Sequence, residues 1–174
     1  LDGWNRSSII KISAAVTSVF LAFFICLLTM NHWKDQGLRY EELNYLTRPY
    51  RSVFLSSVLI GTAGGTLDTV ITVIATLEEL TKRQPEITAK QLWLSGRQVG
   101  RDVIGSMTNI LLFVYISGSV PSLLLYLGNQ WSFKETIEQH LSLEFLRVIA
   151  GSLGIVLSIP ISVLFFLTVR RLKR

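Results

Sequence analysis

The stretch VIGSMTNILLFVYISGSVPSLLLYLGNQ, from Val103 to Gln130, contains no Asp, Glu, Lys or Arg. It exceeds the roughly 20 residues that an α-helix needs to cross a hydrocarbon core of about 30 Å. Two more uncharged windows cover residues 12–31 and 148–169, and a fourth, over 52–77, is interrupted only by Asp68. Charged residues make up 17% of the chain, against about 25% in soluble domains. These windows predict an integral membrane protein.

The predicted fold is all-α: a polytopic membrane helix bundle in a single membrane domain over residues 1–174. The transmembrane helices are expected over residues 9–30, 52–77, 103–127 and 143–168. Pro85 ends the second helix, because proline lacks the N–H that a helix interior needs. Residues 87–101 combine apolar side chains with Lys and Arg, which predicts one amphipathic helix on the cytoplasmic surface. A soluble linker helix is the alternative for that segment.

Basic residues determine the predicted orientation. One side of the membrane receives 11 of the 17 Lys and Arg residues: Arg6, Lys11, Lys82, Arg83, Lys90, Arg97, Arg101, Arg170, Arg171, Lys173 and Arg174. The positive-inside rule makes this side cytoplasmic, so both ends are inside and residues 31–51 and 128–142 are outside. The net charge of +5 would also suit nucleic acid. Because the basic residues lie at span ends, we expect the lipid bilayer as partner and no nucleic acid.

The second span carries a stripe of small and polar residues around a single acid. At helical steps this face presents Gly61, Gly65, Asp68, Thr72, Ala75 and Glu79. Two small residues four positions apart let a partner helix approach closely. The stripe therefore predicts contact with other membrane helices, either of the same chain or of a partner protein.

The third and fourth spans have comparable faces. Asp102, Gly105 and Asn109 share one face of the third span, with Arg101 and Asp102 at its cytoplasmic edge. The fourth places Arg147, Gly151, Gly154, Ser158 and Ser162 on one face. Glu144 and Arg147, three residues apart, can pair near the outer interface.

Helix packing is expected at the glycines of these faces, which are Gly61, Gly65, Gly105, Gly151 and Gly154. The second and third spans should touch along Gly61, Gly65, Asp68 and Thr72 on one side and Gly105 and Asn109 on the other. The first span, whose polar residues are no stronger than Ser and Thr, should contact this cluster least.

Asp68 is the candidate proton or ion relay. An ionisable residue inside a span costs about 2.5 to over 10 kcal/mol by different measures, and it marks function by default. Asp68 lies roughly 14 Å from the cytoplasmic end of its helix at 1.5 Å per residue. Thr72, Asn109 and Ser158 fall at comparable depths and are the expected hydrogen-bonding neighbours. The alternative is structural: Asp68 only bonds a neighbouring helix and holds the bundle together.

An enzyme is not expected. Both histidines lie in predicted outside loops, no nucleophile–base pair is visible, and no catalytic residues are assigned. Cys26 is the single cysteine, so no internal disulfide or cysteine-based metal cluster can form. No metal site and no cofactor are therefore predicted.

Three segments resemble the YibE/F-like family of bacterial multi-pass membrane proteins. They are GTAGGTLDTV at 61–70, SGRQVGRDVIGSMTN at 95–109 and GSLGIVLSIP at 151–160. The segment from Gly100 to Met107 matches the family's Gly-Arg-Asp-x-x-Gly-x-Met pattern, whereas Leu67 and Thr69 replace the Met and Val that flank the family's Asp. Family members usually have further helices before this region. The resemblance implies the C-terminal part of a longer chain in the bacterial cytoplasmic membrane.

The order of the polar spans is also similar to the membrane half of SecF and the resistance-nodulation-division exporters. In those proteins an intramembrane Asp relays protons to drive movement outside the membrane. By this analogy the chain is expected to serve transport or export, coupled to an ion gradient through Asp68. The alternative is a non-transporting accessory or assembly subunit whose polar stripes only pack helices.

The orientation is tested with introduced cysteines and a maleimide that cannot cross membranes. In intact cells Gln36→Cys and Gln130→Cys should be labelled, because both positions lie in predicted outside loops. Gln84→Cys, beyond the cytoplasmic end of the second span, should be labelled only after the cells are opened. If only Gln84→Cys were labelled in intact cells, the true orientation would be the reverse of the predicted one.

Overall fold

The computed structural model describes residues 6–32, 34 and 49–171. Within these ranges the chain forms α1 (Arg6–His32), α2 (Tyr50–Arg83), α3 (Ala89–Gly128) and α4 (Phe133–Arg171), and no strand. Each helix is long and apolar enough to cross a membrane. The predicted all-α bundle with four membrane-spanning helices is confirmed.

A tight corner joins α2 to α3. The backbone N–H of Gln84 donates to the Leu80 carbonyl over 2.9 Å and ends α2, one residue before Pro85. Thr88 then begins α3 with a reciprocal capping box: its hydroxyl accepts from the Gln91 N–H, and the Gln91 side chain accepts from the Thr88 N–H. Both helix ends thus satisfy backbone groups that would otherwise lack partners.

The predicted separate surface helix over residues 87–101 is not found. Residues 89–101 are the first turns of α3, which continues unbroken to Gly128 and includes Pro121. Its buried positions here are Leu92, Gly96 and Gly100. Gly96 lies against Leu77 and Val163, and Gly100 against Ile159. No helix breaker separates the two halves, and the glycines let α3 pack onto its neighbours instead of lying flat on the membrane.

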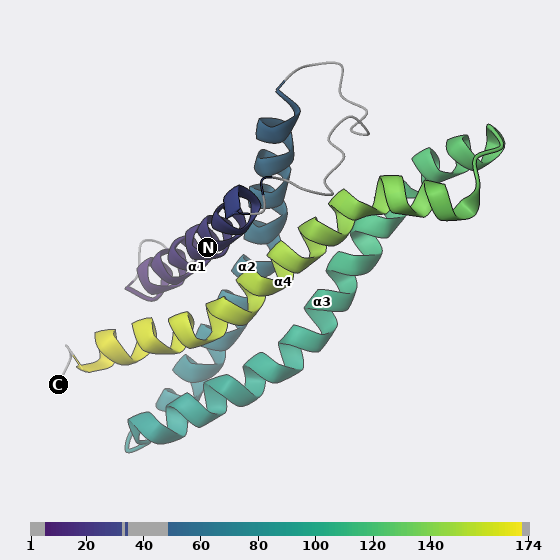
Figure 1. Ribbon diagram of the computed structural model, residues 1–174. Coiled ribbons are helices and arrows are strands. Elements are labelled where there is room, and N and C mark those ends of the chain that lie inside the picture. Colours follow the sequence, from purple (N-terminus) through teal and green to yellow (C-terminus); the bar gives the residue numbers. More distant parts are fainter. Residues whose placement is uncertain (1–5, 33, 35–48, 172–174) are drawn as a thin grey trace.

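Helix α4 occupies the centre of the bundle. It packs against α1, α2 and α3, whereas α1 and α3 lie on opposite sides of it (Figure 1). Apolar residues lie on all faces of α4: Ile155 and Val163 are buried among the other helices, whereas Ile149 and Leu164 are exposed. Helix α3 is the most peripheral, since few of its side chains are buried.

The first helix packs into the interior along its small residues, where Ala22 lies next to Gly154 of α4. The expectation that it contacts the predicted polar cluster of α2 and α3 least stays a prediction. Its buried residues include the small Ala14, Ala15, Ser18, Ala22 and Cys26, together with Ile10, Val19 and Met30. The large residues Phe20 and Phe24 point outward and are 60% and 56% exposed. Within a membrane, apolarity does not distinguish lipid from protein, so close packing of small side chains selects the interface.

Polar contacts join the helix ends at the predicted cytoplasmic end. The Lys11 ammonium of α1 lies 3.5 Å from the Glu78 carboxylate of α2. The Arg170 guanidinium of α4 donates to the carbonyls of Pro85 and Ile87, both over 2.9 Å. These contacts bring the start of α1, the α2–α3 corner and the end of α4 to one level.

Gly154 is the position where added volume should do most harm. A Cβ there would lie 2.5 Å from Thr62 Cγ2 and 2.8 Å from Thr66 Oγ1, and threonine is stiff at χ1. Gly154→Ala should therefore lower the stability of the bundle by about 1–3 kcal/mol, the usual effect of overpacking. A thermal melt of the purified protein in detergent measures this.

Gly105→Ala is the matched control, because a Cβ at Gly105 meets nothing within 4 Å. There the gain in helix propensity, about 1 kcal/mol in a helix interior, should leave stability equal or higher. Equal melting temperatures for both variants would contradict the proposed close contact at Gly154.

Candidate functional site

A buried ionic network joins α4 to α2 near their predicted outer ends. Arg147 of α4 is only 8% exposed. Its Nε donates to Ser57 Oγ of α2 over 3.0 Å, and its guanidinium forms an ion pair with Glu144. The guanidinium carbon lies 5.2 Å from the centroid of the Phe54 ring, within reach of a cation–π interaction. The predicted Glu144–Arg147 pair is confirmed.

Sequence reasoning missed that this pair is buried and bound to α2. The signal was present, because Arg147 belongs to the same face as Gly151 and Gly154, which turn into the bundle. The second carboxylate oxygen of Glu144 is buried and has no hydrogen-bond partner among the described residues. Among the described residues, Arg147 is therefore the one ion-pair partner of the Glu144 carboxylate, and the network depends on it.

Asp68 lies on an uncovered face of α2. It is exposed, as are Gly64, Thr72 and Ala75 on the same side of the helix. A Cβ at Gly64 would meet nothing within 4 Å. The Thr72 hydroxyl donates to the backbone carbonyl of Asp68 over 2.8 Å, and not to its carboxylate. In the part of the chain that the structure describes, this carboxylate has no hydrogen bond or ion pair.

The four predicted relay residues do not come together. Ser158 is fully buried, and its hydroxyl donates to the Ile155 carbonyl of its own helix over 2.7 Å. Asn109 is exposed on α3, and Asp68 is exposed on α2. The depth argument placed these residues at similar levels, but it could not determine the rotation of each helix. The prediction that these four residues contact one another is therefore wrong. Proton transfer by Asp68 stays a prediction.

The buried polar residues of the bundle include a pair of threonines that face α4. Thr62 and Thr66 of α2 are buried against Gly154 of α4, with Ala22 of α1 next to them. Neither threonine hydroxyl has a hydrogen-bond partner within residues 6–32 and 49–171. The four-residue spacing of Thr62 and Thr66 places both on one helix face, and this pattern could have predicted the buried pair.

Four of the five glycines predicted to pack helices do so. Gly61 lies against the Tyr115 hydroxyl, Gly65 against Ile155 and Leu111, and Gly151 against Leu111; Gly154 contacts α2. Gly105 is the exception, since it is exposed with open space around it. Helix α3 turns Gly96, Gly100 and Leu111 toward its neighbours, so Gly105 and Asn109 face away. The predicted contact of Gly105 and Asn109 with α2 is wrong.

The remaining predicted positions lie at the edge of the bundle. Arg101 and Asp102 are both exposed on α3, and Arg101 borders a groove between α3 and α4. No group of three His, Cys, Asp or Glu side chains that could hold a metal ion occurs among the residues with described positions.

A comparison with protein-family models shows to which family the chain belongs. The model of the YibE/F-like protein family matches residues 1–171. The chain belongs to the YibE/F-like family. The match covers all four helices of the bundle, so the resemblance seen in the three motif segments is confirmed. No curated protein and no solved structure matches this YibE/F-like chain.

Removing Arg147 should destabilise the bundle strongly. In Arg147→Ala the Glu144 carboxylate stays buried without its cation, which typically costs about 3–5 kcal/mol. The double variant Glu144→Leu/Arg147→Leu should recover most of this loss, because it leaves no unpaired charge. Thermal melts of the purified variants provide the comparison.

The control is the exposed pair Lys134–Glu138 on the same helix, whose side chains are 83% and 64% exposed. Lys134→Ala should change stability by less than about 1 kcal/mol, as is usual for surface pairs. If Arg147→Ala were as mild as Lys134→Ala, the network would have no structural role.

Proposed function

We propose that this YibE/F-like chain is part of an ion-coupled membrane transport or export system in which Asp68 carries the proton. The single observation behind the proposal is an unpaired carboxylate on an uncovered face of α2. Asp68 is 18 residues from Tyr50 and 15 from Arg83, the ends of α2. Glu78, which closes the uncharged window of α2, lies ten residues beyond Asp68. At 1.5 Å per residue Asp68 is therefore roughly 15 Å inside this boundary, near the middle of a hydrocarbon core of about 30 Å.

The physical argument concerns the cost of leaving this group in lipid. Ionisable residues within membrane spans almost always face the bundle interior or a water-filled cavity. The described helices provide neither for Asp68. We infer that further helices, of the full-length chain or of a partner, cover the α2 face formed by Gly64, Asp68, Thr72 and Ala75. Small residues around the acid allow such a helix to approach closely.

A carboxyl group at such an interface can alternate between two states. Desolvation favours its neutral form, and contact with water favours its charged form. A movement of the covering helices that admits and excludes water would therefore load and release a proton at Asp68. The membrane half of SecF and its relatives is the analogy for this mode of action. The proposal involves no enzymatic step.

The second candidate is an accessory or assembly subunit that transports nothing. The observation in its favour is that the α3 face with Asp102, Gly105 and Asn109 is uncovered as well. Two uncovered polar faces suit a subunit held between partners. In that case Asp68 would bind a partner helix through a hydrogen bond that a neutral amide also makes.

Asp68→Asn separates the two candidates, because it keeps the shape and removes the proton. The full-length protein and the variant are reconstituted into vesicles. Proton movement is followed with a pH-sensitive dye, both with and without an imposed proton gradient. If Asp68 relays protons, the variant should assemble normally and its gradient-driven proton movement should fall to background. Normal assembly together with wild-type proton movement would reject the relay.

Infrared difference spectra recorded across the physiological pH range test titration directly. Asp102→Asn, which removes an exposed acid at the edge of the bundle, is the control. A pH-dependent carboxyl band should persist in Asp102→Asn and disappear in Asp68→Asn. Identical spectra for the wild type and Asp68→Asn would show that Asp68 does not titrate and would favour the assembly role.

A further inference from the structure

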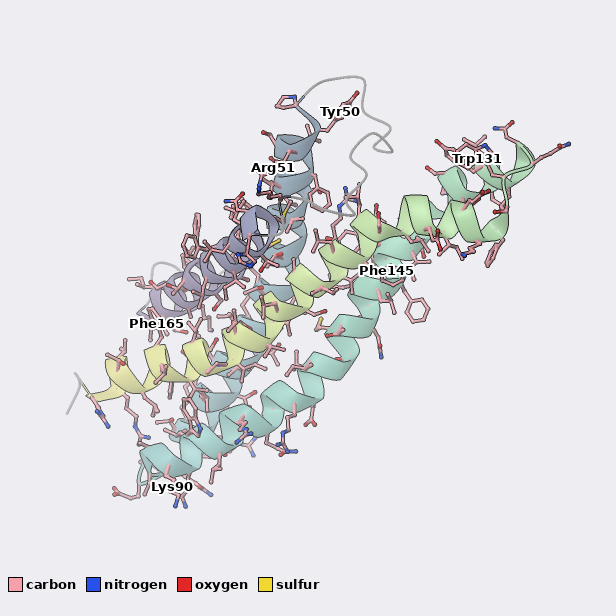
Figure 2. The ribbon with its side chains drawn as sticks, in the orientation of Figure 1. Tyr50, Arg51, Lys90, Trp131, Phe145 and Phe165 are labelled. Carbon is pink, nitrogen blue, oxygen red and sulfur yellow. The ribbon has the colours of Figure 1, made fainter. Side chains whose placement is uncertain are left out.

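The groove between α3 and α4 near the predicted cytoplasmic end contains two cations in otherwise apolar surroundings. Its lining residues are Trp93, Arg97, Arg101, Ile104, Val156, Ile159, Pro160 and Val163. None of these lining residues carries a carboxylate. Figure 2 shows Lys90 at the start of α3, and Trp131 lies beyond the other end of that helix. The α3 residues that line the groove, within 93–104, follow Lys90 in the first half of α3.

Packing contacts place the groove at the boundary of the hydrocarbon core. Gly96, next to Arg97, lies against Leu77 of α2 and Val163 of α4. Glu78, which follows Leu77, is paired with Lys11, and these are the charged residues that close the uncharged windows of α1 and α2. Charged side chains at this level reach toward lipid headgroups while their stems stay in apolar surroundings.

Arg97 and Arg101 are free to bind an anion. They are four residues apart on one face of α3 and are exposed. Neither guanidinium has an ion pair or hydrogen bond with any described residue, in contrast to Arg147 and Arg170. Guanidinium groups bind phosphate through two parallel N–H donors, and two such groups one helical turn apart can hold one phosphate or two adjacent ones.

We propose that this groove is a binding site for an anionic phospholipid. The phosphate lies between Arg97 and Arg101, Trp93 lies at headgroup level, and an acyl chain follows Ile104, Ile159 and Val156 toward the membrane centre. The apolar lining excludes a free phosphate ion as the preferred ligand. Two unpaired cations favour a net negative headgroup over a zwitterionic one, whose amine they would repel. Basic pockets between membrane helices on the cytoplasmic side bind anionic lipids in this way.

The test uses the full-length protein in detergent with phosphatidylglycerol or phosphatidylcholine added, and bound lipid is counted by native mass spectrometry. The wild type should bind phosphatidylglycerol in preference to phosphatidylcholine. The double variant Arg97→Gln/Arg101→Gln should bind phosphatidylglycerol at least roughly ten-fold more weakly, as expected for the loss of charged hydrogen bonds. Val156→Trp, which fills the groove without changing charge, should weaken binding as well.

Lys82→Gln/Lys90→Gln is the matched control, because it removes the same charge from exposed residues of the same end that do not line the groove. It should keep wild-type binding. Equal weakening by both double variants would show diffuse surface attraction and overturn the proposal, as would equal binding of the two lipids. A crosslink from Val156→Cys, at a lining position that is 45% exposed, to a helix other than α1–α4 would show a protein occupant instead. None of these outcomes depends on Asp68.

Discussion

The close approach of α1 and α2 to α4 at Gly154 is the contact on which the rest of the bundle depends. Because Gly154 has no side chain, Thr62 and Thr66 of α2 and Ala22 of α1 can reach the backbone of α4 at the same level. Dispersion between closely packed atoms is the main attraction available to helices in lipid, where apolar burial gains little. The central position of α4 follows from this contact, and α3 is left at the periphery.

The same contact determines which polar residues are inside. Once the α2 face with Thr62 and Thr66 is turned toward α4, the face with Gly64, Asp68 and Thr72 points away from it. An α-helix cannot bury both faces against one neighbour. The bundle therefore satisfies its packing requirement with hydroxyl-bearing and small residues, while its one deep acid stays available to something outside the described helices. This division supports a role for Asp68 in the interaction with further helices.

The fold was largely predictable and the site was not, and the reason is geometric. Uncharged windows report length and apolarity, which suffice to predict membrane helices, and Pro85 marks the corner between α2 and α3. Depth along each helix follows from residue counting. Rotation about each axis does not, because lipid and protein are equally apolar and both faces of α2 contain small residues. The Gly105–Asn109 face of α3 was assigned inward for this reason, although Gly96 and Gly100 make the contacts.

The claim that further helices cover Asp68 is tested most directly by an electron cryomicroscopy structure of the full-length protein in a lipid nanodisc. The account predicts protein side chains or ordered water within hydrogen-bonding distance of the Asp68 carboxyl group, and a helix packed against Gly64. Lipid acyl chains in contact with Asp68 on all sides, with no protein or water near its oxygens, would contradict it.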